Sequence, residues 1–178
     1  MRFAREKNTS DVRSTKPDAC RLEAYVDALK MLGRRELSER QVRQRLARHD
    51  YEATAIDEAI ARLKEERAID DERAAGAIAR SATSIKRRGR IRVKRDIENA
   101  GIASSTATKA LDQTFADVDE DALIAATLSR RLRGREGPLD RSALTRLYRY
   151  LRTQGFDHDR IMRHLDRGTR GRRLEPED

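Results

Sequence analysis

The sequence lacks tryptophan, and aromatic side chains make up only 4% of its 178 residues. Its one cysteine, Cys20, excludes a disulfide bond within the chain. No apolar run comes close to the roughly 20 residues that a membrane-spanning helix needs. Residues 1–16 are polar and lack the apolar core of a signal peptide, so we expect a cytoplasmic protein that does not bind membranes.

Apolar residues are also scarce for a chain of this length. They account for 37% of the sequence, against 40% that are charged. Because one large core needs a higher apolar share, the composition fits either a disordered chain or many short helices that share several small cores. Regularly spaced Leu, Ile, Val and Ala favour the helices, since disordered segments lack such periodicity.

The charged residues are mainly basic: 40 Lys and Arg stand against 31 Asp and Glu, for a formal net charge of +9. This balance favours an anionic partner, such as nucleic acid or an acidic protein surface, although a basic protein without such a partner can have the same composition. Arg greatly outnumbers Lys, which favours bidentate contacts with phosphate or carboxylate groups, although a GC-rich genome produces the same bias.

An apolar pattern recurs three times at intervals of about 50 residues, which is typical of a repeat protein. In each copy two apolar residues four apart are followed by an apolar turn residue, and then by two more apolar residues four apart. The positions are Val42, Leu46, Tyr51, Ile56 and Ile60 in the first copy, Val93, Ile97, Ile102, Ala107 and Leu111 in the second, and Leu147, Leu151, Phe156, Ile161 and Leu165 in the third. Because a spacing of four places residues on one helical face, each copy predicts two helices joined by a tight turn.

The turns share a further feature. Gly101 and Gly155 occupy matching positions, where a residue in the left-handed conformation can end the preceding helix, and Asp50 takes that position in the first copy. Ser38, with Gln41 three residues later, predicts a capping box at the start of the first of these helices.

Another amphipathic segment precedes each helix pair. Its expected core-facing residues are Leu22, Val26, Leu29 and Leu32 in the first copy, Ala74, Ala75, Ile78, Ala79 and Ala82 in the second, and Leu123, Ala126, Leu128 and Leu132 in the third. The sequence therefore predicts an all-α protein of three tandem three-helix repeats that form an elongated, curved body. We expect a disordered arm at 1–18, repeats at 19–69, 70–117 and 118–167, and a flexible tail at 168–178.

The main candidate for a binding surface is the basic segment 86–95, which contains no acidic residue. Arg88, Arg92 and Arg95 are spaced i, i+4 and i+7, so we expect them on one exposed helical face. Such a stripe suits a phosphate backbone or a row of acidic residues. The alternative is a solvated face, but such faces usually mix charges of both signs. The other basic residues of the segment are Lys86, Arg87, Arg90 and Lys94.

A second basic area is expected in the third copy, around Arg130, Arg131, Arg133 and Arg135. Tyr148 or Tyr150 could stack on a nucleic-acid base there. Partly buried packing is the favoured interpretation of Tyr148.

The sequence shows no recognisable catalytic motif. His49, His158 and His164 do not have the spacing of metal ligands, and there is no phosphate-binding glycine loop and no Ser/His/Asp or Cys/His arrangement. Asp70 and Asp71 suit a helix N-cap better than acid–base chemistry. We therefore expect a protein that is not an enzyme and that uses neither a metal nor another cofactor.

Three stretches resemble the RecX family. Residues 28–38 (ALKMLGRRELS) are similar to its opening pattern aLxlLarRehS, residues 69–75 (IDDERAA) to its signature LdDeRFA, and residues 89–102 (GRIRVKRDIENAGI) to GxxrIxxELxxkGI. The resemblance covers roughly residues 22–166 and is weakest in the third copy. The chain departs from the pattern at Ala74, where Phe is usual, and at Leu37, where His is common.

The resemblance implies a regulator that binds the RecA recombinase filament on single-stranded DNA and usually inhibits strand exchange and the coupled ATP hydrolysis, within DNA recombination, repair and the SOS response. We expect a monomer that contacts the filament through Arg88, Arg92 and Arg95, helped by Arg34 and Arg35. The first alternative is a repeat protein that grips the phosphates of single- or double-stranded DNA directly, without sequence preference. The second is a scaffold for an unrelated partner.

Overall fold

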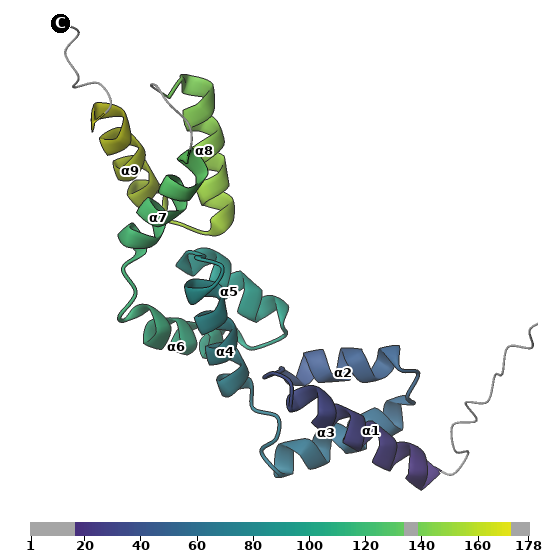
Figure 1. Ribbon diagram of the computed structural model, residues 1–178. Helices are drawn as coiled ribbons and strands as arrows, with labels where there is room; N and C mark the ends of the chain where they lie inside the picture. Colours follow the sequence, from purple (N-terminus) through teal and green to yellow (C-terminus); the bar gives the residue numbers. More distant parts are fainter. Residues whose placement is uncertain (1–16, 134–138, 172–178) are drawn as a thin grey trace, which may run out of the picture. The chain divides into compact units, whose positions relative to one another are not determined.

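The computed structural model describes residues 17–133 and 139–171, and the side chains of 19–133 and 139–166. Within these ranges the chain forms nine α-helices and no strand. Figure 1 shows the order of these helices along the chain. Their bounds are α1 Pro17–Leu32, α2 Glu39–Arg48, α3 Ala53–Glu65, α4 Asp71–Ser84, α5 Arg90–Asn99, α6 Ser104–Phe115, α7 Glu120–Leu132, α8 Arg141–Gln154 and α9 His158–Gly171. No described helix combines the length and the apolar composition of a membrane span.

The helices group in threes, each group around its own apolar core. One core joins α1, α2 and α3, a second joins α4, α5 and α6, and a third joins α7, α8 and α9. The chain divides into two units, of which the first ends at Asp70 and the second begins at Asp71 and carries the second and third groups. The all-α fold of three tandem three-helix repeats is thus confirmed, while the repeat boundaries 19–69, 70–117 and 118–167 remain a proposal.

The recurring helix pair is built as its pattern predicts. All the apolar positions of the three copies are buried, including the turn residues Tyr51, Ile102 and Phe156. The residue before each of these has a positive φ, at 60° for Asp50, 87° for Gly101 and 89° for Gly155. The left-handed residue that ends the middle helix is therefore present in every copy.

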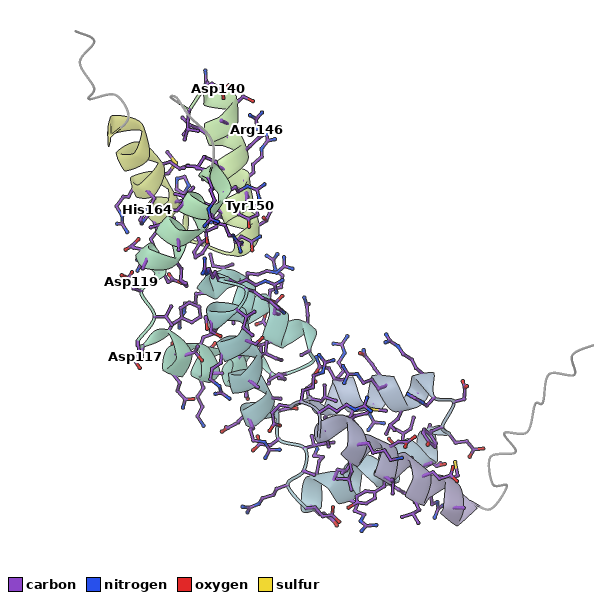
Figure 2. All side chains as sticks on the ribbon, in the orientation of Figure 1. Asp117, Asp119, Asp140, Arg146, Tyr150 and His164 are labelled. Carbon is purple, nitrogen blue, oxygen red and sulfur yellow. The ribbon has the colours of Figure 1, made fainter. Side chains whose placement is uncertain are left out.

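Side chains at the helix starts satisfy backbone N–H groups that have no partner within the helix. Ser38 and Gln41 form the predicted capping box at α2, with the Gln41 N–H donating to Ser38 Oγ over 3.2 Å. Asp119 and Asp140 accept from the first turns of α7 and α8, and both are labelled in Figure 2. Asp157 accepts at the start of α9, and the N–H groups of Arg160 and Asp159 hold its pKa below the ordinary value.

The core-facing stripe predicted for the first helix is wrong except at Leu32, which is partly buried against the core. Leu22 is 56% exposed, and Val26 and Leu29 are each 37% exposed, whereas Ala24 and Ala28 are fully buried. Apolar residues occur all around α1, so their spacing alone does not fix which face packs. Alanine lets α1 approach α3 closely, and the larger side chains are left outside.

The stripe predicted for the first helix of the third copy is wrong in part. Ala126 is exposed, and the most buried side chains of α7 are Ile124 and Thr127. Leu123, Leu128 and Leu132 are partly buried against the core, as expected. In the second copy the prediction is confirmed, with Ala74, Ala75, Ala79 and Ala82 buried and Ile78 packed beside them.

Both departures from the family pattern lie in the interior. Ala74 is fully buried in the second core, so the change from Phe removes volume from the inside of the protein rather than from its surface. Leu37 is buried in the first core, where an apolar side chain replaces a titratable one.

The helices extend beyond the boundaries predicted for the arm and the tail. Helix α1 begins at Pro17, because proline suits the first position of a helix, where its missing N–H leaves no hydrogen bond unmade. Helix α9 continues to Gly171. The other residues of the predicted arm and tail, 1–16 and 172–178, lie outside the described ranges.

Candidate functional site

The basic segment 86–95 is divided between a loop and a helix. Gly89 is the extended residue before α5, which begins at Arg90. Arg88 therefore precedes the helix, and the predicted stripe of Arg88, Arg92 and Arg95 along one helical face is wrong. The stripe was expected because the helix was assumed to start earlier; Arg87, with a φ of 52°, already belongs to the turn before it.

Arg88 and Arg92 converge on one carboxylate. Both form ion pairs with Asp96, Arg88 through Nη1 and Arg92 through Nε at 3.1 Å. Only 18% of the Asp96 side chain is exposed, so the three groups form a partly buried cluster. Charge-assisted bonds of this kind hold the guanidinium groups in place, which favours a structural role for both arginines.

Arg92 also lies at a joint between the second and third helix groups. The N–H of Gly89 donates to the carbonyl of Gln154 over 3.0 Å, and that of Ile91 donates to the carbonyl of Gly155 over 3.1 Å. Gly89, the residue before α5, has no side chain to cap the helix, and carbonyls of the α8–α9 turn accept from its N–H and from that of Ile91 instead.

The joint requires glycine on both sides. A Cβ on Gly89 would lie 2.5 Å from the Gly155 carbonyl oxygen, and one on Gly155 would lie 2.2 Å from the Arg92 nitrogen. Sequence reasoning assigned Gly155 to a turn but did not find this second role. The sequence signal for this role is that Gly89 directly precedes a helix but has no side chain to cap it, so its N-terminal N–H groups need acceptors from elsewhere in the chain.

Glu120, at the start of α7, adds a polar clamp to the same joint. Its Oε1 accepts from the N–H of Arg90 over 3.1 Å, and its Oε2 lies 3.4 Å from Nε of Arg160. The neighbouring Asp121 binds Arg160 and His164, the latter labelled in Figure 2. Burial raises the pKa of Asp121, but the hydrogen bond from His164 and the charge of Arg160 outweigh burial, and the pKa is lowered overall.

Of the remaining basic residues of the segment, Lys86 and Arg95 are exposed, and Arg87, Arg90 and Lys94 are half-buried. Arg90 pairs with Asp112 and lies over the Phe115 ring, and Lys94 lies 3.9 Å from Glu98. Arg95 is exposed and has no ion-pair partner among the described residues, and the same is true of Lys86. These two side chains are therefore the most available cations of segment 86–95.

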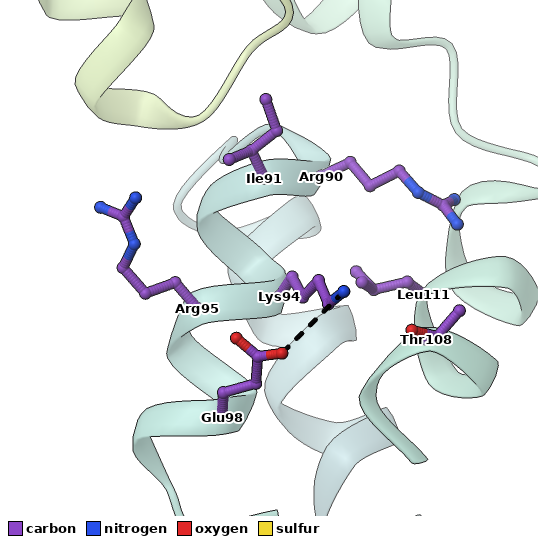
Figure 3. Close-up of a pocket in the computed structure, with 7 residues that line it drawn as sticks. All are labelled: Arg90, Ile91, Lys94, Arg95, Glu98, Thr108 and Leu111. Carbon is purple, nitrogen blue, oxygen red and sulfur yellow. Dashed lines mark ion pairs between the residues drawn. The ribbon is translucent and has the colours of Figure 1, made fainter. Parts of the chain in front are cut away.

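An open hollow of about 390 Å³ lies between α5 and α6, and Figure 3 shows its lining. Arg90 and Arg95 extend to opposite sides of α5, while Lys94 lies between them and is paired with Glu98. Ile91, at the rim, is 46% exposed. Because the cations diverge, the hollow suits an extended anionic surface better than a single small anion.

Arg34 and Arg35 belong to the first unit, in the loop between α1 and α2, and both are exposed. They line a second open hollow of about 390 Å³, together with Met31, Arg45, Arg48 and His49. Sequence reasoning found the first two arginines and missed Arg45 and Arg48. The last two could have been found as basic residues gathered at the end of α2.

The two candidate tyrosines of the third copy both have intramolecular partners. The hydroxyl of Tyr148 lies 3.0 Å from Nδ1 of His158, and the two rings meet edge to face. The guanidinium of Arg131 lies 3.8 Å from the ring centre of Tyr150, which Figure 2 labels. Packing, the favoured interpretation of Tyr148, is therefore what the structure shows.

No cluster of three or more His, Cys, Asp or Glu side chains suited to a metal ion occurs in the described part of the chain.

The chain is similar to several known proteins that share one family name. Residues 24–63 match the family model described as the first three-helix domain of RecX. The chain is 30% identical over 158 residues to the regulatory protein RecX of Geobacillus kaustophilus, covering 86% of this chain and 57% of that protein. It is 29% identical over 135 residues to that of Halorhodospira halophila, covering 75% and 81%.

Two solved structures share the fold. A crystal structure of RecX from Lactobacillus salivarius superposes with a TM-score of 0.62 at 22% identity, covering 84% of this chain and 98% of that one. A crystal structure described as regulatory protein RecX gives a TM-score of 0.68 at 21% identity, covering 84% and 73%.

Proposed function

Because this chain belongs to the RecX family, we propose that it regulates the RecA recombinase by binding the filament that RecA forms on single-stranded DNA, and that it inhibits strand exchange and the coupled ATP hydrolysis. The observation that carries the proposal is the similarity to proteins named regulatory protein RecX, which extends over 86% of the chain and so over more than one helix group. In this proposal the protein acts by binding the filament and does not itself catalyse a reaction.

The surface of the second helix group supports this function. Lys86 and Arg95 are exposed and have no ion-pair partner among the described residues, and Arg95 lines the hollow between α5 and α6 together with Arg90 and Lys94. A surface of this kind attracts an acidic protein face or a phosphate backbone. Arg88 and Arg92 contribute indirectly, because their pairing with Asp96 fixes the start of α5.

Steady-state ATP hydrolysis by RecA on single-stranded DNA tests the proposal. Added protein is expected to lower the rate in a dose-dependent way, at physiological salt and at concentrations that leave free DNA unbound. Hydrolysis that stays unchanged at saturating protein would contradict the proposal.

A pair of variants tests the surface. Lys86→Gln with Arg95→Gln removes two unpaired charges, and we expect about tenfold more protein to be needed for half-inhibition, which corresponds to roughly 0.7 kcal/mol per contact. The matched control, Lys30→Gln with Lys109→Gln, removes two exposed charges that are paired with Asp27 and Glu72. The control is expected to inhibit like the original protein; equal weakening in both variants would remove this surface from the proposal.

A further inference from the structure

The hollow of the first unit is lined by four arginines, and no carboxylate in its lining neutralises their charges. Arg34 and Arg35 reach it from the loop after α1, and Arg45 and Arg48 reach it from the last turn of α2. No acidic residue lines the hollow. No ion pair involves these four side chains in the described part of the chain.

Several other basic residues of the same unit form ion pairs. Arg21 lies 3.0 Å from Glu58, Arg62 lies 2.9 Å from Glu66, and Lys64 lies 2.9 Å from Glu39. Arg43 forms an ion pair with Asp57. The four guanidinium groups of the hollow thus form a local concentration of positive charge that attracts an external anion.

The elements that carry the four arginines are firmly held. The N–H groups of Gly33 and Arg34 donate to the carbonyls of Leu29 and Met31 over 2.8 and 3.2 Å, which continues the end of α1 into the loop. The buried Leu37 and the capping box of Ser38 anchor the other end of that loop. The guanidinium groups therefore lie on a preorganised backbone, so less ordering is needed when a ligand binds.

The lining of the hollow indicates the class of ligand. Protein interfaces depend on apolar or aromatic anchors at their centre, and Met31 is the only apolar residue in this lining. A nucleic-acid backbone needs no such anchor, because phosphates are held by charge and by the bidentate geometry of arginine. The lining contains His49 but no Phe, Tyr or Trp, so charge contacts with the backbone outweigh contacts that read the bases.

We propose that Arg34, Arg35, Arg45 and Arg48 form a binding site for the backbone phosphates of nucleic acid, used by this protein without the recombinase. This property goes beyond the proposed function, because it concerns contact between this chain and DNA alone. The site engages a few phosphates, so binding is weak at physiological salt and becomes strong only at low salt.

Fluorescence anisotropy of a labelled thymidine 20-mer, titrated with the full chain over a series of salt concentrations, tests the site. The pocket variant carries Arg34→Gln, Arg35→Gln, Arg45→Gln and Arg48→Gln. The matched control carries Arg21→Gln, Arg43→Gln, Arg62→Gln and Lys64→Gln, which removes the same number of charges from the same unit. Circular dichroism verifies that both variants fold.

We expect the pocket variant to lose at least tenfold in affinity at low salt. The slope of log affinity against log salt should become shallower by about 2 to 3, as expected for three or four lost contacts to a single strand. The control should change the slope by less than about 1. Equal losses in both variants would mean that net charge alone attracts DNA and would overturn the proposal, as would normal binding by the pocket variant.

Two further measurements keep the test decisive. If the fourfold variant does not fold, the double variant Arg34→Gln with Arg35→Gln replaces it, because it changes only loop residues. Its slope of log affinity against log salt should change by about half as much as expected for the fourfold variant. Poly-glutamate of similar charge serves as a competitor: displacement of DNA only by a large excess supports a phosphate site, and tighter binding of poly-glutamate than of DNA would overturn it. Recombinase inhibition is measured separately, so a failure of this site and a failure of the proposed function are distinguishable.

Discussion

Replacing Gly155 with alanine should weaken the protein far more than the same change in the equivalent turn of the second helix group. Gly155 and Gly101 have nearly the same φ, 89° and 87°. In this region a Cβ costs about 1–2 kcal/mol in either turn. Gly101 is exposed, so Gly101→Ala should cost no more than that.

At Gly155 a second cost applies. Its Cβ would lie 2.2 Å from the nitrogen and 2.3 Å from the Cβ of Arg92, so the turn has to move away from α5. That movement breaks the two hydrogen bonds donated by Gly89 and Ile91, each with a net contribution of about 0.5–1.5 kcal/mol. We therefore expect Gly155→Ala to lower the free energy of unfolding by about 2–5 kcal/mol.

Urea denaturation followed by circular dichroism compares the two variants, and amide hydrogen exchange localises the effect. Protection of the Gly89 and Ile91 amides should fall in Gly155→Ala and stay unchanged in Gly101→Ala. Equal losses of stability in the two variants, with protection of both amides retained, would refute the structural role of the joint.

Three further results are expected. Asp96→Asn should cost about 1–3 kcal/mol in urea denaturation, since it leaves two guanidinium groups without their partly buried partner; a loss below about 0.5 kcal/mol would contradict the cluster. Hydrogen bonds from Lys30, the larger cause, and from Tyr51 lower the pKa of Asp27 in the folded protein. The charged carboxylate therefore stabilises the fold at pH values above the pKa of the unfolded state, and this stabilisation is lost as the pH falls through the lower pKa of the folded state. Tyr51→Phe should raise the pKa of Asp27, measured by NMR titration, and reduce that acid-induced loss; an unchanged pKa would exclude this role of the hydroxyl. Leu46→Ala should lower the free energy of unfolding by about 2–5 kcal/mol, and Leu22→Ser by less than about 0.5 kcal/mol, in the same denaturation assay. Comparable losses in the two variants would show that Leu22 belongs to the core.

The helix pairs and their turns could be predicted because each position is constrained in more than one way. Val93 and Ile97 share a helical face, Gly101 has the freedom that the turn needs, and Ile102 must be apolar to cover the core. The first helix of each copy lacks such a turn to fix its register. In α1, large apolar residues occur beside Ala24 and Ala28, and only the close packing of α1 on α3 decides which set is buried.

The candidate site was harder to predict because its contacts are tertiary. Arg88 reaches Asp96 from outside the helix, a pairing that helical spacing does not indicate. Gly89 and Gly155 meet across two helix groups, and no local pattern joins them. Arg45 and Arg48 were overlooked because they are separated in sequence from Arg34 and Arg35, although all four line one hollow.

The central claim, that this chain binds the recombinase filament, is tested most directly by binding to an immobilised filament. RecA is assembled on single-stranded DNA with a non-hydrolysable ATP analogue, and interferometry compares it with bare DNA and with RecA lacking DNA, at physiological salt. We predict saturable binding to the filament at concentrations that leave both separate components largely unoccupied. Binding that is no tighter to the filament than to bare DNA would contradict the claim.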